Sequence, residues 1–228
     1  MARSKIIQDL ANSTVDTMTA LKRAKVLLSE LGDAELLNWV NCEITGYPNG
    51  VTLPNYRIKY GNLFGSYFKG SMASHMKWTN VSLPLGKMPD DIKDSILSIQ
   101  FREGVDALKQ LSESSEGRLV KTIPADFFPI IAAYNEDMYM NITSAQVLVG
   151  IQCIQSVFST IENRLLDVLI LLEKEFGNLD TLDLDMSSKT SEELQDITKK
   201  IIVIVYNDNH VDIGDNNKIT KSDIASSI

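Results

Sequence analysis

Apolar residues recur three or four positions apart in much of the chain, which is the pattern of amphipathic helices. Near the N-terminus this spacing predicts helices over residues 6–10, 14–31 and 33–45, and a single bent helix is the alternative for the first two. Gly32 and Gly46 follow the second and third of these segments, and glycine commonly ends a helix because it adopts the left-handed conformation without strain. The second and third helices therefore form a predicted helical hairpin.

The spacing changes to a period of two over residues 55–86, as in a strand with one buried face. Tyr56, Ile58 and Tyr60 alternate with charged residues, and Lys69-Gly70-Ser71 is a turn signal before a second alternating run. This segment predicts an antiparallel hairpin or a small sheet.

Helical spacing returns after Pro89 and continues to Leu111, which predicts a single helix over residues 89–111. Residues 119–123 are consistent with a short strand, and Pro124 precedes a predicted short helix over 125–133.

The strongest helical signal begins at the capping-box sequence Thr143-Ser144-Ala145-Gln146 and ends at Gly177. Its apolar residues follow alternating steps of four and three: Val147, Ile151, Ile154, Phe158, Ile161, Leu165, Val168 and Leu172. Polar and charged residues interrupt the segment too often for a membrane span. Further apolar positions widen the stripe, which favours a buried central helix over the alternative of a coiled coil between protomers.

The C-terminal part of the chain differs in character. Residues 178–191 are acidic and aperiodic, and Thr190-Ser191-Glu192-Glu193 caps a predicted short helix. The β-branched run at 201–206 and the Asn- and Gly-rich sequence after it predict short strands, whose open edges favour pairing with another chain. The candidate assembly residues are Ile201, Val203, Val205, Asp215, Asn216 and Asn217.

Together these elements predict a mainly helical α+β fold. It comprises an N-terminal helical hairpin, a small antiparallel hairpin or sheet, a long central helix and a short β-rich C-terminal tail. The predicted organisation is a main α+β domain over 1–177, an acidic linker and short helix over 178–200, and the tail over 201–228.

The composition indicates a protein of the reducing cytoplasm. The 228 residues suffice for a hydrophobic core, and the two cysteines, Cys42 and Cys153, have no spacing typical of a disulfide or a zinc site. Asp9 interrupts the N-terminal apolar residues, so no secretory signal is expected.

The formal charge of -8 disfavours generic nucleic-acid binding, because the chain as a whole repels phosphates. The first 25 residues are a local exception, with five basic and two acidic residues. A solvated helix face explains this excess, and an anionic partner is the alternative.

No arrangement of residues predicts catalysis, a cofactor or a metal. His75 and His210 have no local catalytic partner, and both cysteines fit apolar helical positions. Acidic and amide residues in the tail (Asp208, Asp212, Asp215, Asn216 and Asn217) raise calcium as an alternative, but their spacing departs from a calcium loop and favours a turn.

Three short motifs resemble the AbiTii domain family. They are the A-L-R/K-x-A helix at 21–27, the W-x-x-x-E-L-x-G-Y-P turn at 39–48 and the L-P-x-Y-R sequence at 53–57, with Ile44 in place of the leucine. The resemblance covers residues 1–177, and its specific motifs lie between 21 and 57. The tail sequence at 214–222 is also similar to the G-D-N-N-x-I-x-x-S endings of many bacterial conflict-system proteins.

The resemblance implies a role in bacterial abortive infection, a defence against phage, and implies no agreed catalytic residues. The family-like residues Trp39, Glu43, Tyr47, Tyr56 and Arg57, here named the corner cluster, flank one helix-to-strand corner. We predict that they form a structural ion pair between Glu43 and Arg57 with an aromatic lock around it, and a recognition surface is the alternative.

Two function hypotheses follow. The first is a non-enzymatic interaction or sensor module that forms a homo-oligomer or binds a phage or defence-system protein. The second is a toxin-like enzyme whose site is assembled from scattered residues. The few histidines and the lack of a nucleophile motif or metal cluster in the sequence favour the first.

Overall fold

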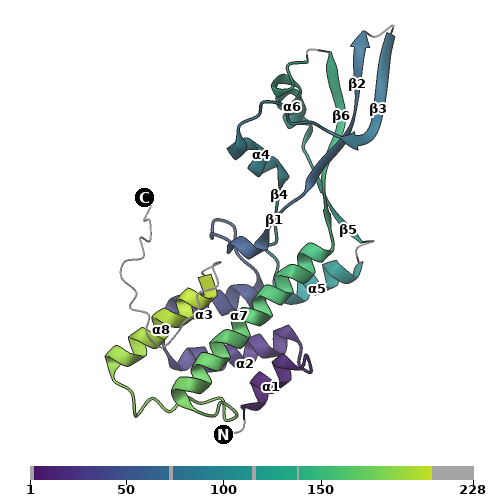
Figure 1. Cartoon of the computed structure of the whole chain (residues 1–228). Helices are drawn as coiled ribbons and strands as arrows, with labels where there is room; N and C mark the ends of the chain where they lie inside the picture. The colour runs from purple at the N-terminus through teal and green to yellow at the C-terminus, as the bar shows by residue number, and fades with distance from the viewer. Residues whose placement is uncertain (1–2, 72–73, 115–116, 138, 207–228) are drawn as a thin grey trace.

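The structure, a computed structural model, describes residues 3–71, 74–114, 117–137 and 139–206. The described chain is elongated, with a helical bundle at one end and a four-stranded sheet at the other (Figure 1). The predicted fold class, α+β and mainly helical, is confirmed.

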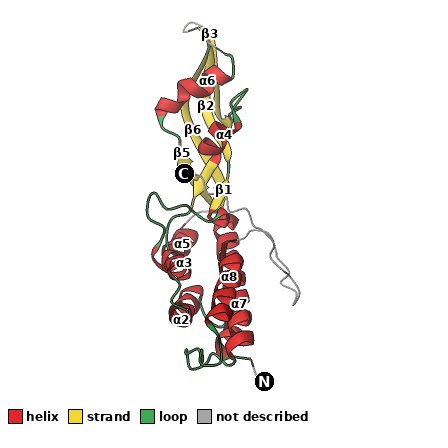
Figure 2. Ribbon diagram, turned by 90° about the vertical axis from the view of Figure 1, so that its left-hand side faces the viewer, coloured by secondary structure: helices red, strands yellow, loops and turns green. Residues whose placement is uncertain are grey.

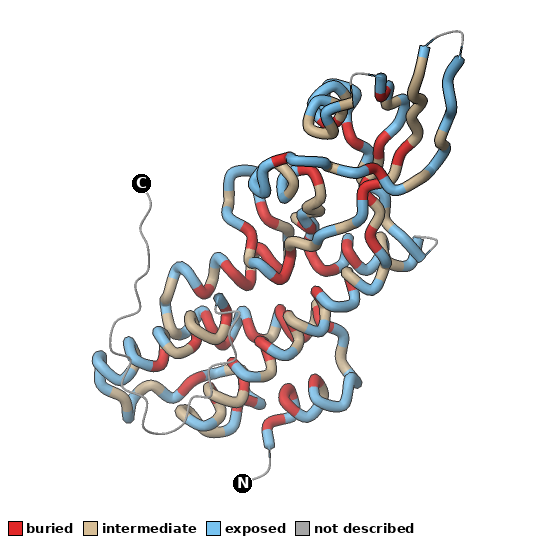
Figure 3. The backbone as a smooth tube through the Cα atoms, turned by 45° about the horizontal axis from the view of Figure 1, so that its top comes forward, coloured by how far each residue is buried: buried red, intermediate tan, exposed pale blue. Residues whose placement is uncertain are grey.

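The bundle surrounds the long helix α7 (Gln152–Phe176), whose inward residues Ile154, Ile161 and Leu165 are fully buried. The other bundle helices are α1 (Lys5–Ala11), α2 (Thr17–Glu30), α3 (Ala34–Thr45), α5 (Val105–Ser114) and α8 (Ser191–Tyr206). Figure 3 shows buried positions along the inner sides of these helices. The prediction of a buried central helix is thus confirmed by a single chain, without a second protomer.

The sheet has the strand order β3-β2-β6-β5, and every neighbouring pair is antiparallel. Its strands are β2 (Asn62–Ser71), β3 (Ser74–Ser82), β5 (Arg118–Thr122) and β6 (Met140–Gly150). The helices α4 (Asp90–Leu97) and α6 (Phe128–Tyr134), the latter preceded by the 3-10 turn η2 (Ala125–Phe127), cover one face of this sheet (Figure 2). A second apolar core lies between them and the sheet.

A two-stranded ribbon lies at the junction of bundle and sheet. Its strands are β1 (Ile58–Tyr60) and β4 (Ser98–Gln100), which pair antiparallel, and the 3-10 turn η1 (Asn55–Arg57) precedes β1. None of the described helices is both long enough and apolar enough to cross a membrane.

The predicted capping box at Thr143–Gln146 is wrong, because this segment belongs to strand β6 and not to the long helix. Pairing of β6 with β2 and β5 satisfies its backbone groups, and Val147 packs in the core beneath the sheet. The long helix therefore begins at Gln152. Long-range strand pairing has overridden a local helical signal.

The single helix predicted over 89–111 is also wrong, because α4, β4 and α5 replace it. The chain between β4 and α5 has to run against the end of α3. A Cβ atom on Gly104 would lie 2.3 Å from the backbone oxygen of Ile44, so only glycine permits this approach.

The strand predicted at Ile201 to Tyr206 is instead the last part of helix α8. Ile197, Ile201 and Val205 repeat every four residues and are buried against the bundle. Burial of this apolar face outweighs the weak preference of β-branched residues for strands. The rest of the tail, including Asp215, Asn216 and Asn217, lies outside the described residues.

Candidate functional site

The corner cluster forms at the junction of bundle and sheet. Trp39 and Glu43 lie one turn apart on the same face of α3, and Tyr47 follows directly after the helix ends. Tyr56 and Arg57 come from η1. Asp33 caps α3 by accepting hydrogen bonds from the backbone N–H groups of residues 35 and 36, which fixes where this helix begins.

Glu43 is the centre of the cluster. Its Oε2 pairs with Arg57 Nη2 at 2.5 Å, and its Oε1 accepts hydrogen bonds from the Tyr47 hydroxyl at 2.6 Å and the Tyr56 hydroxyl at 2.5 Å. Trp39 Nε1 in turn donates to the Tyr56 hydroxyl at 3.1 Å. The predicted pairing of Glu43 with Arg57 is confirmed, and the aromatic residues do surround it.

Arg57 also connects the cluster to a distant segment of chain. Its Nη1 donates to the backbone oxygens of Phe101 at 2.9 Å and of Glu103 at 2.7 Å. The N–H of Tyr47 donates to the Arg102 oxygen at 2.7 Å. The cluster thus holds the end of α3, η1 and the segment between β4 and α5 together.

The surroundings of the corner cluster fix the protonation states of its tyrosines and its arginine. Burial, and then the charge of Glu43, raises the pKa values of Tyr47 and Tyr56 well above the usual tyrosine range. Burial disfavours the charged form of Arg57, but attraction and hydrogen bonding to Glu43 outweigh this and raise its pKa. The tyrosines therefore remain neutral hydrogen-bond donors and Arg57 remains a cation at neutral pH.

The cluster is closed to solvent. The side chains of Glu43 and Arg57 are both 0% exposed, and no buried polar side-chain atom in the described chain lacks a hydrogen-bond partner. A substrate has no direct access to these groups. Their arrangement is that of a structural joint.

Sequence reasoning missed Arg164, a buried residue of α7 that lies next to the corner cluster. Its guanidinium is 4.4 Å from the centre of the Tyr56 ring, and it donates a hydrogen bond to the backbone oxygen of Val205. A charged residue directly before the buried Leu165 in the apolar stripe was the available signal. Arg164 thereby connects α8 to the joint.

The other residues considered from sequence are dispersed. Burial raises the pKa of the Cys42 thiol, which disfavours a nucleophilic thiolate. His75 lies exposed on β3, with its ring 5.5 Å from that of Phe68. The second histidine, His210, lies outside the described residues. Of the candidate assembly residues, Ile201 and Val205 are buried and Val203 is half-buried.

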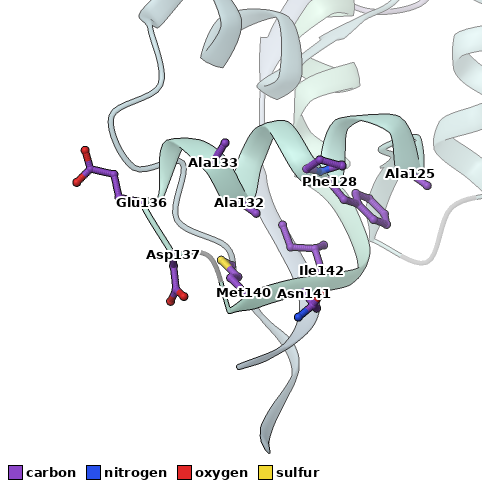
Figure 4. Close-up of a pocket in the computed structure, with 10 residues that line it drawn as sticks. Ala125, Phe128, Ala132, Ala133, Glu136, Asp137, Met140, Asn141 and Ile142 are labelled. Carbon is purple, nitrogen blue, oxygen red and sulfur yellow. The ribbon is translucent and has the colours of Figure 1, made fainter. Parts of the chain in front are cut away.

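A cavity of about 690 Å³ lies between α6 and β6 (Figure 4). Phe128, Met140 and Ile142 give it apolar walls, and Glu136 and Asp137 lie at one end. Both carboxylates are already paired, Glu136 with Lys87 and Asp137 with Lys69. Within the described ranges, no group of three His, Cys, Asp or Glu side chains is arranged to hold a metal ion.

The fold and the buried joint define an α+β protein in which a helical bundle carries a projecting sheet. The chain belongs to the AbiTii family, whose sequence model matches residues 4–198. This membership indicates a role in abortive infection, a form of phage defence. Searches of curated proteins and of solved structures found no match to the chain.

Proposed function

We propose that this protein is a non-enzymatic interaction or sensor module of an abortive-infection system, which acts in the cytoplasm by self-association or partner binding. The closure of the corner cluster is the observation that supports this proposal most. The family-like residues form their hydrogen bonds with one another and with the backbone, which suits a rigid structural joint and not a reaction centre.

We propose a separate role for each successive segment of the chain. Residues 1–177 form the main domain, helix α8 packs onto its bundle, and the tail that follows mediates assembly into a homo-oligomer or docking to a phage or defence-system protein. Ile201 and Val205 are buried in the bundle, so we now assign assembly to residues 207–228, including Asp215, Asn216 and Asn217.

A panel of single alanine replacements tests the absence of catalysis. Each exposed Asp, Glu, His, Ser and Thr is replaced in turn, and phage plating efficiency is measured on cells that express each variant. Circular dichroism and light scattering confirm that each variant keeps its fold and its assembly state. We expect no single replacement to abolish protection, because binding surfaces tolerate most single truncations.

The opposite result would favour the toxin-like enzyme over the interaction module. One polar side chain whose removal abolishes protection, without a change in folding or assembly, would behave as a catalytic group and would contradict the proposal.

A further inference from the structure

One face of the four-stranded sheet is not covered by any described helix, since α4 and α6 both lie on the other face (Figures 1 and 2). Lys121 marks the covered face, because its Nζ donates to the backbone oxygens at the end of α4. Residues that alternate with this row point the opposite way. They form what is here named the open sheet face.

The strand register gives the members of the open sheet face. Phe64 lies opposite Ser82 and Gln146, and Phe68 lies opposite Lys77 and Asn141. The remaining positions are Asn62, Ser66, Gly70, His75, Arg118, Val120, Thr122, Ser144 and Leu148. Strand β2 alternates regularly because the extra residues of its two bulges lie in β3 and β6.

The apolar side chains of this face lack core partners. Phe64, Phe68 and Leu148 are half-buried and Val120 is 54% exposed, and none of the four belongs to a hydrophobic core cluster. The Phe68 ring lies near the exposed His75 ring, which extends the aromatic surface to the edge strand. Aromatic rings on the uncovered face of a sheet are the side chains on which single-stranded nucleic acids stack their bases.

The charge of the face contrasts with that of the chain. Lys77 and Arg118 are exposed here, and no Asp or Glu occupies any of its positions, although the chain carries a net charge of -8. A surface that has no carboxylates and carries a basic side chain at each end is complementary in charge to a polyanion. The remaining positions are mainly amides and hydroxyls, which is a polar composition for a protein-binding surface and suits hydrogen bonding to base edges.

We propose that the open sheet face binds single-stranded RNA. Bases stack on Phe64 and Phe68, phosphates lie near Lys77 and Arg118, and the amides of Asn141 and Gln146 contact base edges. Hydroxyl and amide groups beside the rings can also contact the ribose 2′-hydroxyl, which favours RNA over DNA. A duplex does not fit because its bases are already stacked. This inference goes beyond the proposed function, because it assigns a second ligand to a surface that the proposed protein association does not use.

Fluorescence anisotropy with labelled oligouridine RNA and the purified full-length chain tests the proposal. We expect binding that weakens as the salt concentration rises, because counterion release contributes to phosphate contacts. The double variant Phe64→Leu/Phe68→Leu keeps apolar volume but loses the rings, and we expect at least a tenfold loss of affinity. Lys77→Glu, an exposed change that threatens folding little, is expected to weaken binding severalfold.

Matched controls lie outside the face. Tyr60→Leu removes an exposed aromatic ring from β1, and Lys199→Glu reverses an exposed charge on α8. Neither is expected to change binding. Circular dichroism establishes that each variant is folded.

Three results would overturn the inference. These are no anisotropy change at low salt, equal binding of oligothymidine DNA, or undiminished binding by the Phe64→Leu/Phe68→Leu and Lys77→Glu variants. A loss of mass in light scattering for the phenylalanine variant would instead show that a second copy occupies the face, which also contradicts RNA binding. The RNA-binding assay does not involve phage, whereas the alanine panel measures phage protection. A negative RNA result would therefore refute this inference without deciding whether the protein is an interaction module.

Discussion

Glu43 and Arg57 form a fully buried ion pair, with 2.5 Å between Glu43 Oε2 and Arg57 Nη2. The pair joins a bundle helix to the turn that precedes the junction ribbon, and Arg57 continues the connection to the backbone of Phe101 and Glu103. The ion pair and its hydrogen bonds therefore hold the end of α3, η1 and the segment between β4 and α5 together at the junction of bundle and sheet.

Removal of one partner should be costly. We expect Arg57→Met to lower the free energy of unfolding by about 3–5 kcal/mol, because it leaves the Glu43 carboxylate buried without a counter-charge. Urea denaturation measures this. Lys93→Met, which breaks the exposed pair with Asp90, is the matched control and should cost below about 1 kcal/mol. Equal free energies of unfolding for wild type and Arg57→Met would contradict the structural role of the Glu43–Arg57 pair.

The buried tyrosines predict a loss of stability at high pH. The folded protein keeps Tyr47 and Tyr56 protonated well above the ordinary pKa of 10.0, whereas the unfolded chain releases these protons near that value. Their contribution is fully present below about pH 10 and decreases above it. Urea midpoints between about pH 8 and pH 11 should fall less steeply for Tyr47→Phe/Tyr56→Phe than for wild type, and parallel curves would refute this.

The inward face of α7 should not tolerate charge. Ile154→Asp or Leu165→Asp places a carboxylate at a position of 0% exposure, and we expect a loss of more than about 3 kcal/mol or a failure to fold. Asn163→Asp adds the same charge at an exposed position of this helix and should have little effect on thermal melting. Folded monomers from the first two variants would instead support the coiled-coil alternative.

The tail prediction now distinguishes two truncations. Deletion of 207–228 should leave the melting temperature unchanged but lower the assembly state or abolish protection. Deletion of 201–228 should also destabilise the bundle, because it removes Ile201 and Val205 from the core. If the shorter deletion kept both assembly and phage protection, the tail would have no role in assembly.

Hydrophobic spacing predicted the bundle well because its helices bury one face each. α2, α3 and the body of α7 were found this way, and the ends of α3 at Asp33 and of α7 at Gly177 are where the sequence placed them, whereas α2 begins after its N-cap Asp16 and not at residue 14. These features depend on neighbouring residues only. Local chemistry is enough to specify them.

The errors lie where distant contacts decide. Residues 143–150 have a helical signal but belong to β6, which pairs with β2 and β5. Residues 201–206 have a strand signal but form the end of α8, which packs its apolar face on the bundle. At the corner cluster the pair of Glu43 with Arg57 was predictable because both residues flank the helix-to-strand corner that carries the family-like motifs. The contact of Arg164 with the Tyr56 ring was not, because more than 100 residues separate them in the chain.

The central claim is that the protein acts by association, and its size in the cell tests this most directly. Extracts of infected and uninfected cells that express the full-length chain are separated by size-exclusion chromatography and probed by immunoblotting. We expect the infected extract to contain the chain in a complex well above its own mass of 25.4 kDa. Elution at the mass of one chain in both extracts, from cells that are nevertheless protected against phage, would contradict the account.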